Sequence, residues 1–155
     1  MSTKKSTGLC DKLLGGAGGD TLQNIFALGQ VMIYGGTVPG AADDATGEGV
    51  TSTLLCTVKN YNGGSPIGIT FDDSVGGTIA KAVAETWSGV NVAAGTAAFF
   101  RLVAVGDDGT LSTTQPRLQG TVIAGGPDAM VLGNLSLSSG ATFPLPYFTV
   151  TLQPT

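Results

Sequence analysis

The sequence predicts an all-β protein, an antiparallel β-sandwich of jelly-roll or Greek-key type with a short helical N-terminal arm. About eight short segments rich in β-branched and aromatic residues are separated by Gly, Asp and Asn, which is typical of this class. No alternation of strand and helix patterns is visible, as a parallel α/β sheet would require. Glycine is abundant, with 25 of 155 residues. We divide the chain into an arm at residues 1–28 and a β-sandwich domain at residues 29–155.

The arm begins with a short helix and continues into a glycine-rich hinge. Ser6 or Thr7 can cap the first helix, in which Leu9 and Leu13 are four residues apart and share one face. Residues 15–19 contain four glycines, which end this helix and form a flexible hinge.

The second helix of the arm begins at Asp20. Its side chain can accept a hydrogen bond from the Gln23 amide while Gln23 reaches back, as in a capping box. Both helices are too short to be stable alone. We therefore expect them to dock either on their own domain or on a neighbouring chain.

The strands of the domain differ in how clearly the sequence marks them. Residues 96–105 are apolar on both faces apart from Arg101, which predicts a central strand covered on both sides. Residues 79–87 contain alanines that also permit a helical turn. The strands are expected at residues 31–34, 53–58, 67–71, 79–87, 96–105, 118–123, 135–137 and 147–152. Turn signals follow several of them, among them residues 62–64 and 106–109.

Three side chains inside the strand patterns need a partner or a core. A buried charge must be paired, so neighbouring strands would make a Glu85–Arg101 salt bridge the natural arrangement. A contact of these two residues across a subunit interface is the alternative. Trp87, the single tryptophan, is expected to anchor a core or an interface, and less often such a residue is a sugar-stacking platform.

The composition argues against an enzyme and against a metal or cofactor site. The chain has no histidine, which removes the usual nucleophilic triads and histidine-containing zinc sites. Cys10 and Cys56 are expected to be free, small apolar thiols of a reducing cytoplasm, and a single disulfide that closes a long loop is the lesser alternative. The pairs at residues 43–44, 72–73 and 107–108 are three Asp-Asp sequences at predicted turns, where the carboxylates bond the local backbone. Calcium binding by these loops is the lesser alternative.

The charge pattern limits the partners. The net charge is −4, so we expect no specific binding to nucleic acid. Lys4, Lys5 and Lys12 form the single basic cluster, which is either a solubilising tail or a contact with nucleic acid or an acidic partner. No signal peptide and no membrane span are expected. Aromatic residues make up only 6% of the chain, so subunit contacts are expected to supplement a small core.

An ordered series of short motifs resembles small virion proteins of tailed bacteriophages, most of all capsid decoration (cement) proteins. The series consists of residues 6–9, 33–36, Pro39 with 41–45, 80–82, 85–89, 94–101, 117–122, Asp128 and 148–151. The resemblance implies an all-β trimer made in the host cytoplasm and bound to the outer surface of the capsid. It also implies that the major capsid protein is the partner and that the trimer stabilises the shell by bridging neighbouring capsomers.

Seven residues are the expected contacts with the capsid or with other subunits. They are Lys4, Lys5, Leu9, Leu13, Glu85, Trp87 and Arg101. The alternative function is that of a tail- or fibre-associated β-domain which binds host glycans or another virion protein. That alternative would use Trp87, Tyr34, Tyr61 or Tyr147 as stacking platforms.

Overall fold

A computed structural model describes residues 3–47, 51–61, 65–125 and 130–152. The expected turn at residues 62–64 and Asp128 of the motif series lie outside these ranges. The described part of the chain contains two helices, α1 (Thr7–Leu13) and α2 (Leu22–Ile25). Its strands are β1 (Thr3–Lys5), β2 (Gln30–Gly36), β3 (Ser52–Asn60), β4 (Thr78–Ala80), β5 (Trp87–Val90), β6 (Gly95–Val103), β7 (Arg117–Ile123), β8 (Met130–Val131), β9 (Ser136–Leu137), β10 (Thr142–Pro144) and β11 (Thr149–Thr151).

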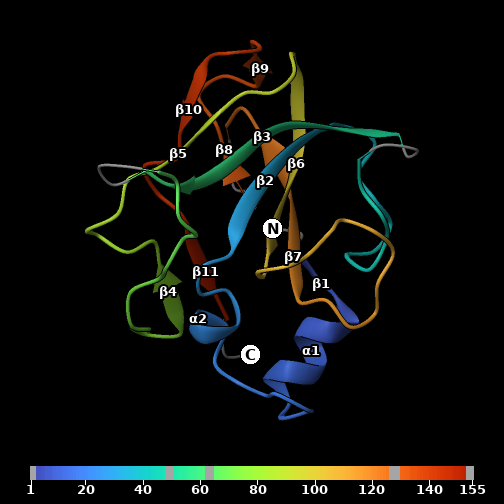
Figure 1. Cartoon of the computed structure of the whole chain (residues 1–155), viewed down its shortest axis with the longest axis vertical. Helices are drawn as coiled ribbons and strands as arrows, with labels where there is room; N and C mark the ends of the chain where they lie inside the picture. Colours follow the sequence, from blue (N-terminus) through green and yellow to red (C-terminus); the bar gives the residue numbers. More distant parts are fainter. Residues whose placement is uncertain (1–2, 48–50, 62–64, 126–129, 153–155) are drawn as a thin grey trace.

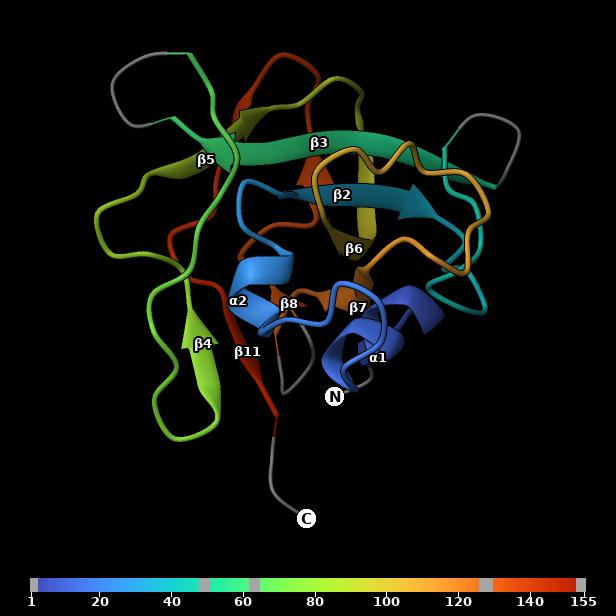
Figure 2. The same cartoon turned by 60° about the horizontal axis from the view of Figure 1, so that its bottom comes forward.

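Most strands belong to one large, strongly curved sheet. Its path runs β1-β7-β6-β2-β3-β5-β10, with β8 added to β7 and β9 added to β6, while β11 and β4 form a separate two-stranded sheet (Figures 1 and 2). All pairs between named strands are antiparallel except β7 with β8. The all-β, mainly antiparallel prediction is confirmed. The two facing sheets of a sandwich stay a prediction, because nine strands belong to one sheet.

β6 is the central strand that the sequence predicts. It lies between β7 and β2, and both its Phe100 side and its Arg101 side are buried. Residues 67–71, in contrast, form isolated bridges to several neighbours instead of the expected strand. Gly68 permits one of these bridges, because a Cβ atom there would lie 1.9 Å from the Leu28 oxygen. Residues 79–87 contain a turn between β4 and β5, as their alanines permit.

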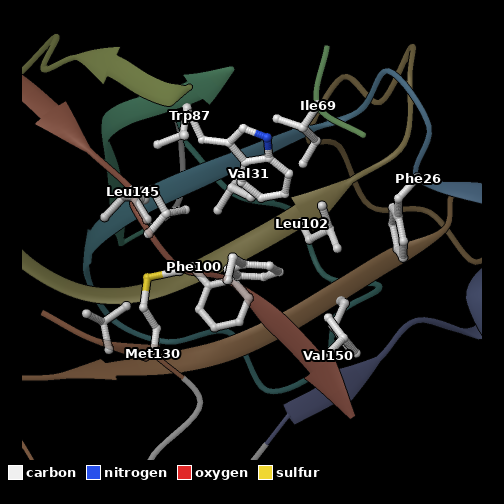
Figure 3. Packing of buried hydrophobic residues seen from close by; sticks show 14 of the residues in the cluster. Phe26, Val31, Ile69, Trp87, Phe100, Leu102, Met130, Leu145 and Val150 are labelled. Atoms are coloured by element: carbon white, nitrogen blue, oxygen red, sulfur yellow. The ribbon is translucent and has the colours of Figure 1, made fainter. Parts of the chain in front are cut away.

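The hydrophobic core gathers aromatic side chains from distant parts of the chain. Trp87 is 1% exposed, and its ring centroid lies 5.3 Å from that of Phe71 in an edge-to-face contact. Phe148, next to β11, lies 5.9 Å from Trp87 and 5.5 Å from Phe100 on β6. Figure 3 shows how side chains of the large sheet and of β11 converge here. Trp87 is therefore a core residue of this chain.

The N-terminal arm is built into the same core. β1 pairs with β7, and Ser6 caps α1 by accepting a hydrogen bond from the Leu9 amide. The Leu9 side chain is fully buried, and Phe26 beyond α2 is also fully buried. The expected choice between docking sites is thus settled in favour of the chain's own domain. Residue 28 is not a packing boundary, and removing residues 1–19 would take away a strand and a core side chain.

The cap of the second helix differs from the expected one. Thr21, not Asp20, is the N-cap of α2, and its hydroxyl accepts a hydrogen bond from the Asn24 amide. Asp20 instead accepts from the Thr21 amide and from the Asn24 side chain. The Gln23 side chain donates to the carbonyl oxygen of Phe71, which ties α2 to the loop before β4. The threonine hydroxyl therefore takes the capping place expected of the aspartate.

Replacing Trp87 tests its place in the core. We expect Trp87→Ala to lower the free energy of unfolding by about 3–5 kcal/mol, because it leaves a cavity among packed rings. Urea denaturation followed by circular dichroism measures the change. The control is Val83→Ala, at a side chain that is 89% exposed, with an expected change below about 0.5 kcal/mol. A loss for Trp87→Ala no larger than for the control would contradict the described core.

The two cysteines should differ in reactivity. Both thiols are free, Cys10 is half-buried and Cys56 is buried in β3, where desolvation raises the pKa of its thiol to about 11. Native Cys56 should therefore stay protonated and unreactive toward iodoacetamide at about pH 9, while Cys10 is alkylated. An unfolded thiol ionises near its ordinary pKa of about 8.5, so Cys56 makes stability fall as the pH rises from there toward 11. Equal labelling of both native thiols is the opposing result.

Candidate interaction surfaces

The outer face of the large sheet carries an unusual set of buried polar side chains. Arg117 and Gln119 alternate along β7 with Leu118, which faces the core, and they therefore lie on the opposite face. The strand register places Gln119 between Lys4 of β1 and Arg101 of β6. Arg117, Gln119 and Arg101 are at most 1% exposed. Such groups must find hydrogen-bond partners, and two long loops provide them.

Arg117 joins these two loops, at residues 37–47 and 104–116. Its Nε and Nη2 atoms donate to the two carboxylate oxygens of Asp107 at 2.6 and 2.8 Å. Nη2 also donates to the backbone carbonyl oxygen of Thr110 at 2.7 Å, and Nη1 donates to the backbone carbonyl oxygen of Asp43 at 3.2 Å. Arg117 and Asp107 form the one ion pair among the described residues, and both side chains are at most 1% exposed. We call this group, with Arg101, Gln119 and Lys4, the arginine clasp.

Arg101 does not pair with Glu85, so the expected salt bridge is wrong. Its Nε and Nη2 atoms donate to Gln119 Oε1 at 3.2 and 2.5 Å, and its Nη1 atom donates to the backbone carbonyl oxygen of Asp44 at 2.8 Å. The reason is the strand order, because β2 and β3 separate β6 from β5. Burial, and then the neighbouring Arg117, lower the pKa of Arg101.

Glu85 fixes the core tryptophan instead. Its carboxylate accepts hydrogen bonds from the amide and hydroxyl of Thr70 at 2.9 and 2.7 Å. It also accepts from the indole Nε1 of Trp87 at 2.5 Å. Glu85 therefore satisfies the one polar atom of a buried indole and ties the loop before β4 to the start of β5.

Lys4 and Asp43 are also used inside the fold. Lys4 Nζ donates to the carbonyl oxygens of Pro39 and Gly40 at 3.1 and 2.8 Å, so this lysine holds its own chain. The Asp43 carboxylate accepts from the amide and hydroxyl of Thr7, at the start of α1. Asp44, Asp107 and Asp108 accept hydrogen bonds from backbone amides two or three residues away, as the turn interpretation expects. Asp43 and Asp72 instead accept from the amides of Thr7 and Val83, which are 36 and 11 residues away.

The seven expected contact residues are thus mostly unavailable to a partner. Arg101, Leu9 and Trp87 are buried, and Lys4 and Glu85 are committed to internal hydrogen bonds. Lys5 remains exposed, and Leu13 remains half-buried. The structure does not bring Lys5 and Leu13 together with the other five in one surface.

One free surface surrounds the end of α1. Leu14 is 87% exposed there, Lys12 is half-buried, and residues 15–20 are all exposed. Beside them a hollow of about 240 Å³ separates the helices from the β4–β11 sheet. Its apolar lining residues are Leu13, Leu22, Ile79, Val150 and Leu152. We call this area the α1-end surface; the sequence pointed to it only through Leu13 and Lys12.

A second free surface is a larger hollow of about 570 Å³, which we call the C-terminal groove. Residues 131–138 form one wall and residues 141–147 form the other. Its apolar lining includes Leu132, Leu137, Phe143, Leu145 and Pro146. Tyr147 at the rim is 87% exposed, and Val131 is 52% exposed. In the sequence Tyr147 was a candidate only as a sugar-stacking platform, and nothing in the sequence indicated the groove beside it.

Comparison with known proteins gives no family for this chain. No family model matches it, and no curated protein or solved structure matches it either. In the described ranges, no three or more Cys, Asp or Glu side chains form a group that could hold a metal ion. None of the described helices has the length and apolar character needed to cross a bilayer.

The arginine clasp predicts a strong energetic coupling. Arg117→Met and Asp107→Asn should each lower the free energy of unfolding by about 3–5 kcal/mol, because each leaves the partner buried without its counterpart. The double variant should lose clearly less than the sum, with a coupling of about 0.5–3 kcal/mol. Urea denaturation of the four proteins measures this cycle. Strict additivity would show that the pair does not act as one unit.

Proposed function

We propose that this chain is a structural, non-enzymatic virion protein of a tailed phage. It decorates the outer surface of the capsid, where it contacts the major capsid protein as a trimer and stabilises the shell by bridging neighbouring capsomers. The resemblance of the motif series to decoration proteins supports this function. The structural observation that carries it is the distribution of charge and apolar surface.

Several ionisable side chains are bonded inside the fold, whereas a number of large apolar side chains outside the core face solvent. Arg101, Arg117, Asp107, Glu85 and Lys4 all bond to other parts of the chain. Large apolar side chains that are exposed in the described ranges are Leu14, Leu28, Ile67, Val75, Val83, Val90, Val92, Val105, Leu111, Val131, Tyr147 and Leu152. This arrangement suits a protein that works through contact area on a rigid frame.

The α1-end surface is the proposed contact with the capsid. It combines the exposed Leu14 with an apolar hollow and the half-buried cation of Lys12. Ser6 and Asp43 fix the start of α1 to the rest of the domain, so the helix presents Leu14 without a separate ordering step. A rigid contact of this kind resists separation of the two capsomers that it joins.

The alternative function, glycan binding at a tail or fibre, gains no support from the aromatic residues. Trp87 and Tyr34 are at most 2% exposed, and Tyr34 is stacked on Phe99 with ring centroids 4.9 Å apart. Tyr61 is half-buried, and only Tyr147 is strongly exposed among the four proposed platforms. These rings do not form a stacking platform together.

Leu14→Asp tests the proposed attachment. The variant should fold normally, because Leu14 is 87% exposed, but it should bind shells that lack the protein at least about tenfold more weakly. Co-sedimentation with such shells measures binding, and copy number in purified particles measures occupancy. The matched control is Leu111→Asp, at a side chain that is 72% exposed in the loop at residues 104–116. Only a few copies of the wild-type protein per particle, or unchanged binding by Leu14→Asp, would contradict the proposal.

A further inference from the structure

We infer that the C-terminal groove is the surface through which this chain binds a second copy of itself. The inference deepens the proposed function, on which it rests for the number of subunits, by naming the face that forms the trimer. The contact seats Tyr147 of one copy in the groove of the next copy. Four features of the structure lead to this assignment.

The first feature is shape. The groove has a volume of about 570 Å³, and its floor includes Leu132, Leu137 and Phe143, each at most 8% exposed. Tyr147 stands at its rim with 87% of its surface exposed. The same small area therefore offers both a hollow and a protruding aromatic ring. An aromatic anchor that enters an apolar hollow is the usual centre of a protein interface.

The second feature is charge. No lining residue of the groove is charged, and residues 130–155 contain no Asp, Glu, Lys or Arg at all. The chain nevertheless has a net charge of −4. Two copies can therefore meet here without placing like charges opposite each other. A strongly charged partner would find no counterpart at this face, so a second copy is the occupant that fits best.

The third feature is the edge strand beside the groove. The Asn91 amide donates to the Ala141 carbonyl oxygen, and the Leu145 amide donates to the Trp87 carbonyl oxygen. The backbone polar groups of the odd-numbered residues 141–145 therefore face β5 and its continuation. The even-numbered positions therefore point away from β5, and two of them are Pro144 and Pro146. Proline has no amide proton, so this edge cannot accept another β-strand by regular pairing. The contact is made by side chains, which favours a closed oligomer over a growing fibril.

The fourth feature is continuity with neighbouring exposed apolar surface. Val90 of β5 is directly opposite Thr142 of β10 and is 51% exposed. Thr142 itself lines the groove, so the uncharged surface extends from the groove across β10 onto β5. This extension adds contact area around the central tyrosine, where surrounding residues exclude water.

The position of the groove also leaves the capsid contact free. β9 and β10 lie at one end of the long axis of the molecule, and α1 lies at the other end (Figure 1). A subunit can therefore hold the shell through its α1-end surface while it holds another copy through its C-terminal groove. Because the Tyr147 ring and the hollow lie side by side, three copies around a threefold axis can each place this ring in the groove of the next copy, and the trimer is then closed.

The test is the mass of the purified protein in solution. Sedimentation equilibrium of the wild-type chain should give three times the 15.4 kDa subunit mass. Tyr147→Asp and Tyr147→Lys should both weaken association by about thirtyfold or more, because either charge would be buried in an uncharged groove. Val83→Asp, at another strongly exposed site, should behave as the wild type. Circular dichroism confirms that each variant is folded.

The outcomes separate this inference from the proposed function. A wild-type chain that stays monomeric at all concentrations, or Tyr147 variants that associate as the wild type does, would overturn the groove as the self-contact. A trimer that is broken by both Tyr147 variants supports the groove, even if the protein is absent from particles. If the trimer is broken by the Tyr147 variants and the protein is absent from particles, the self-contact is supported and the proposed capsid function is contradicted.

Discussion

The buried ion pair between Arg117 and Asp107 is the interaction on which the rest of the structure depends. Two charges that are at most 1% exposed are stable only when their remaining polar atoms are also bonded, and here loop carbonyl groups meet that need. Arg101 and Lys4 extend the same arrangement to Asp44, Pro39 and Gly40. The outer face of the sheet is thereby covered by loops instead of by a second large sheet.

This arrangement has a consequence for function. Arg101, Arg117 and Lys4 are bonded to the chain's own loops, while several large apolar side chains are exposed together with charged residues such as Lys5 and Asp73. The α1-end surface and the C-terminal groove each combine an apolar hollow with a strongly exposed apolar side chain, Leu14 and Tyr147 respectively. Their separation along the long axis suits a subunit that links a shell to its own copies (Figure 1).

Local patterns predicted the elements well, and non-local pairing limited the rest. The cap at Ser6 and the central strand β6 could be read from short stretches of sequence. The Glu85–Arg101 pairing failed because the order of strands in the sheet is not encoded locally. The C-terminal groove escaped prediction because the turn that brings residues 131–138 and 141–147 together as its two walls carries no sequence signal of a hollow between them. The hydrogen bonds that Lys4 and Glu85 make inside the fold could not be predicted from the sequence either, because their partners lie 35 and 15 residues away.

The most direct measurement of the central claim is a cryo-electron reconstruction of the intact phage particle. The account predicts trimeric density over the junctions between capsomers, with the α1 end of each subunit against the shell and the C-terminal grooves turned toward neighbouring copies. Bare capsomer junctions, or density for this chain only on the tail, would contradict it.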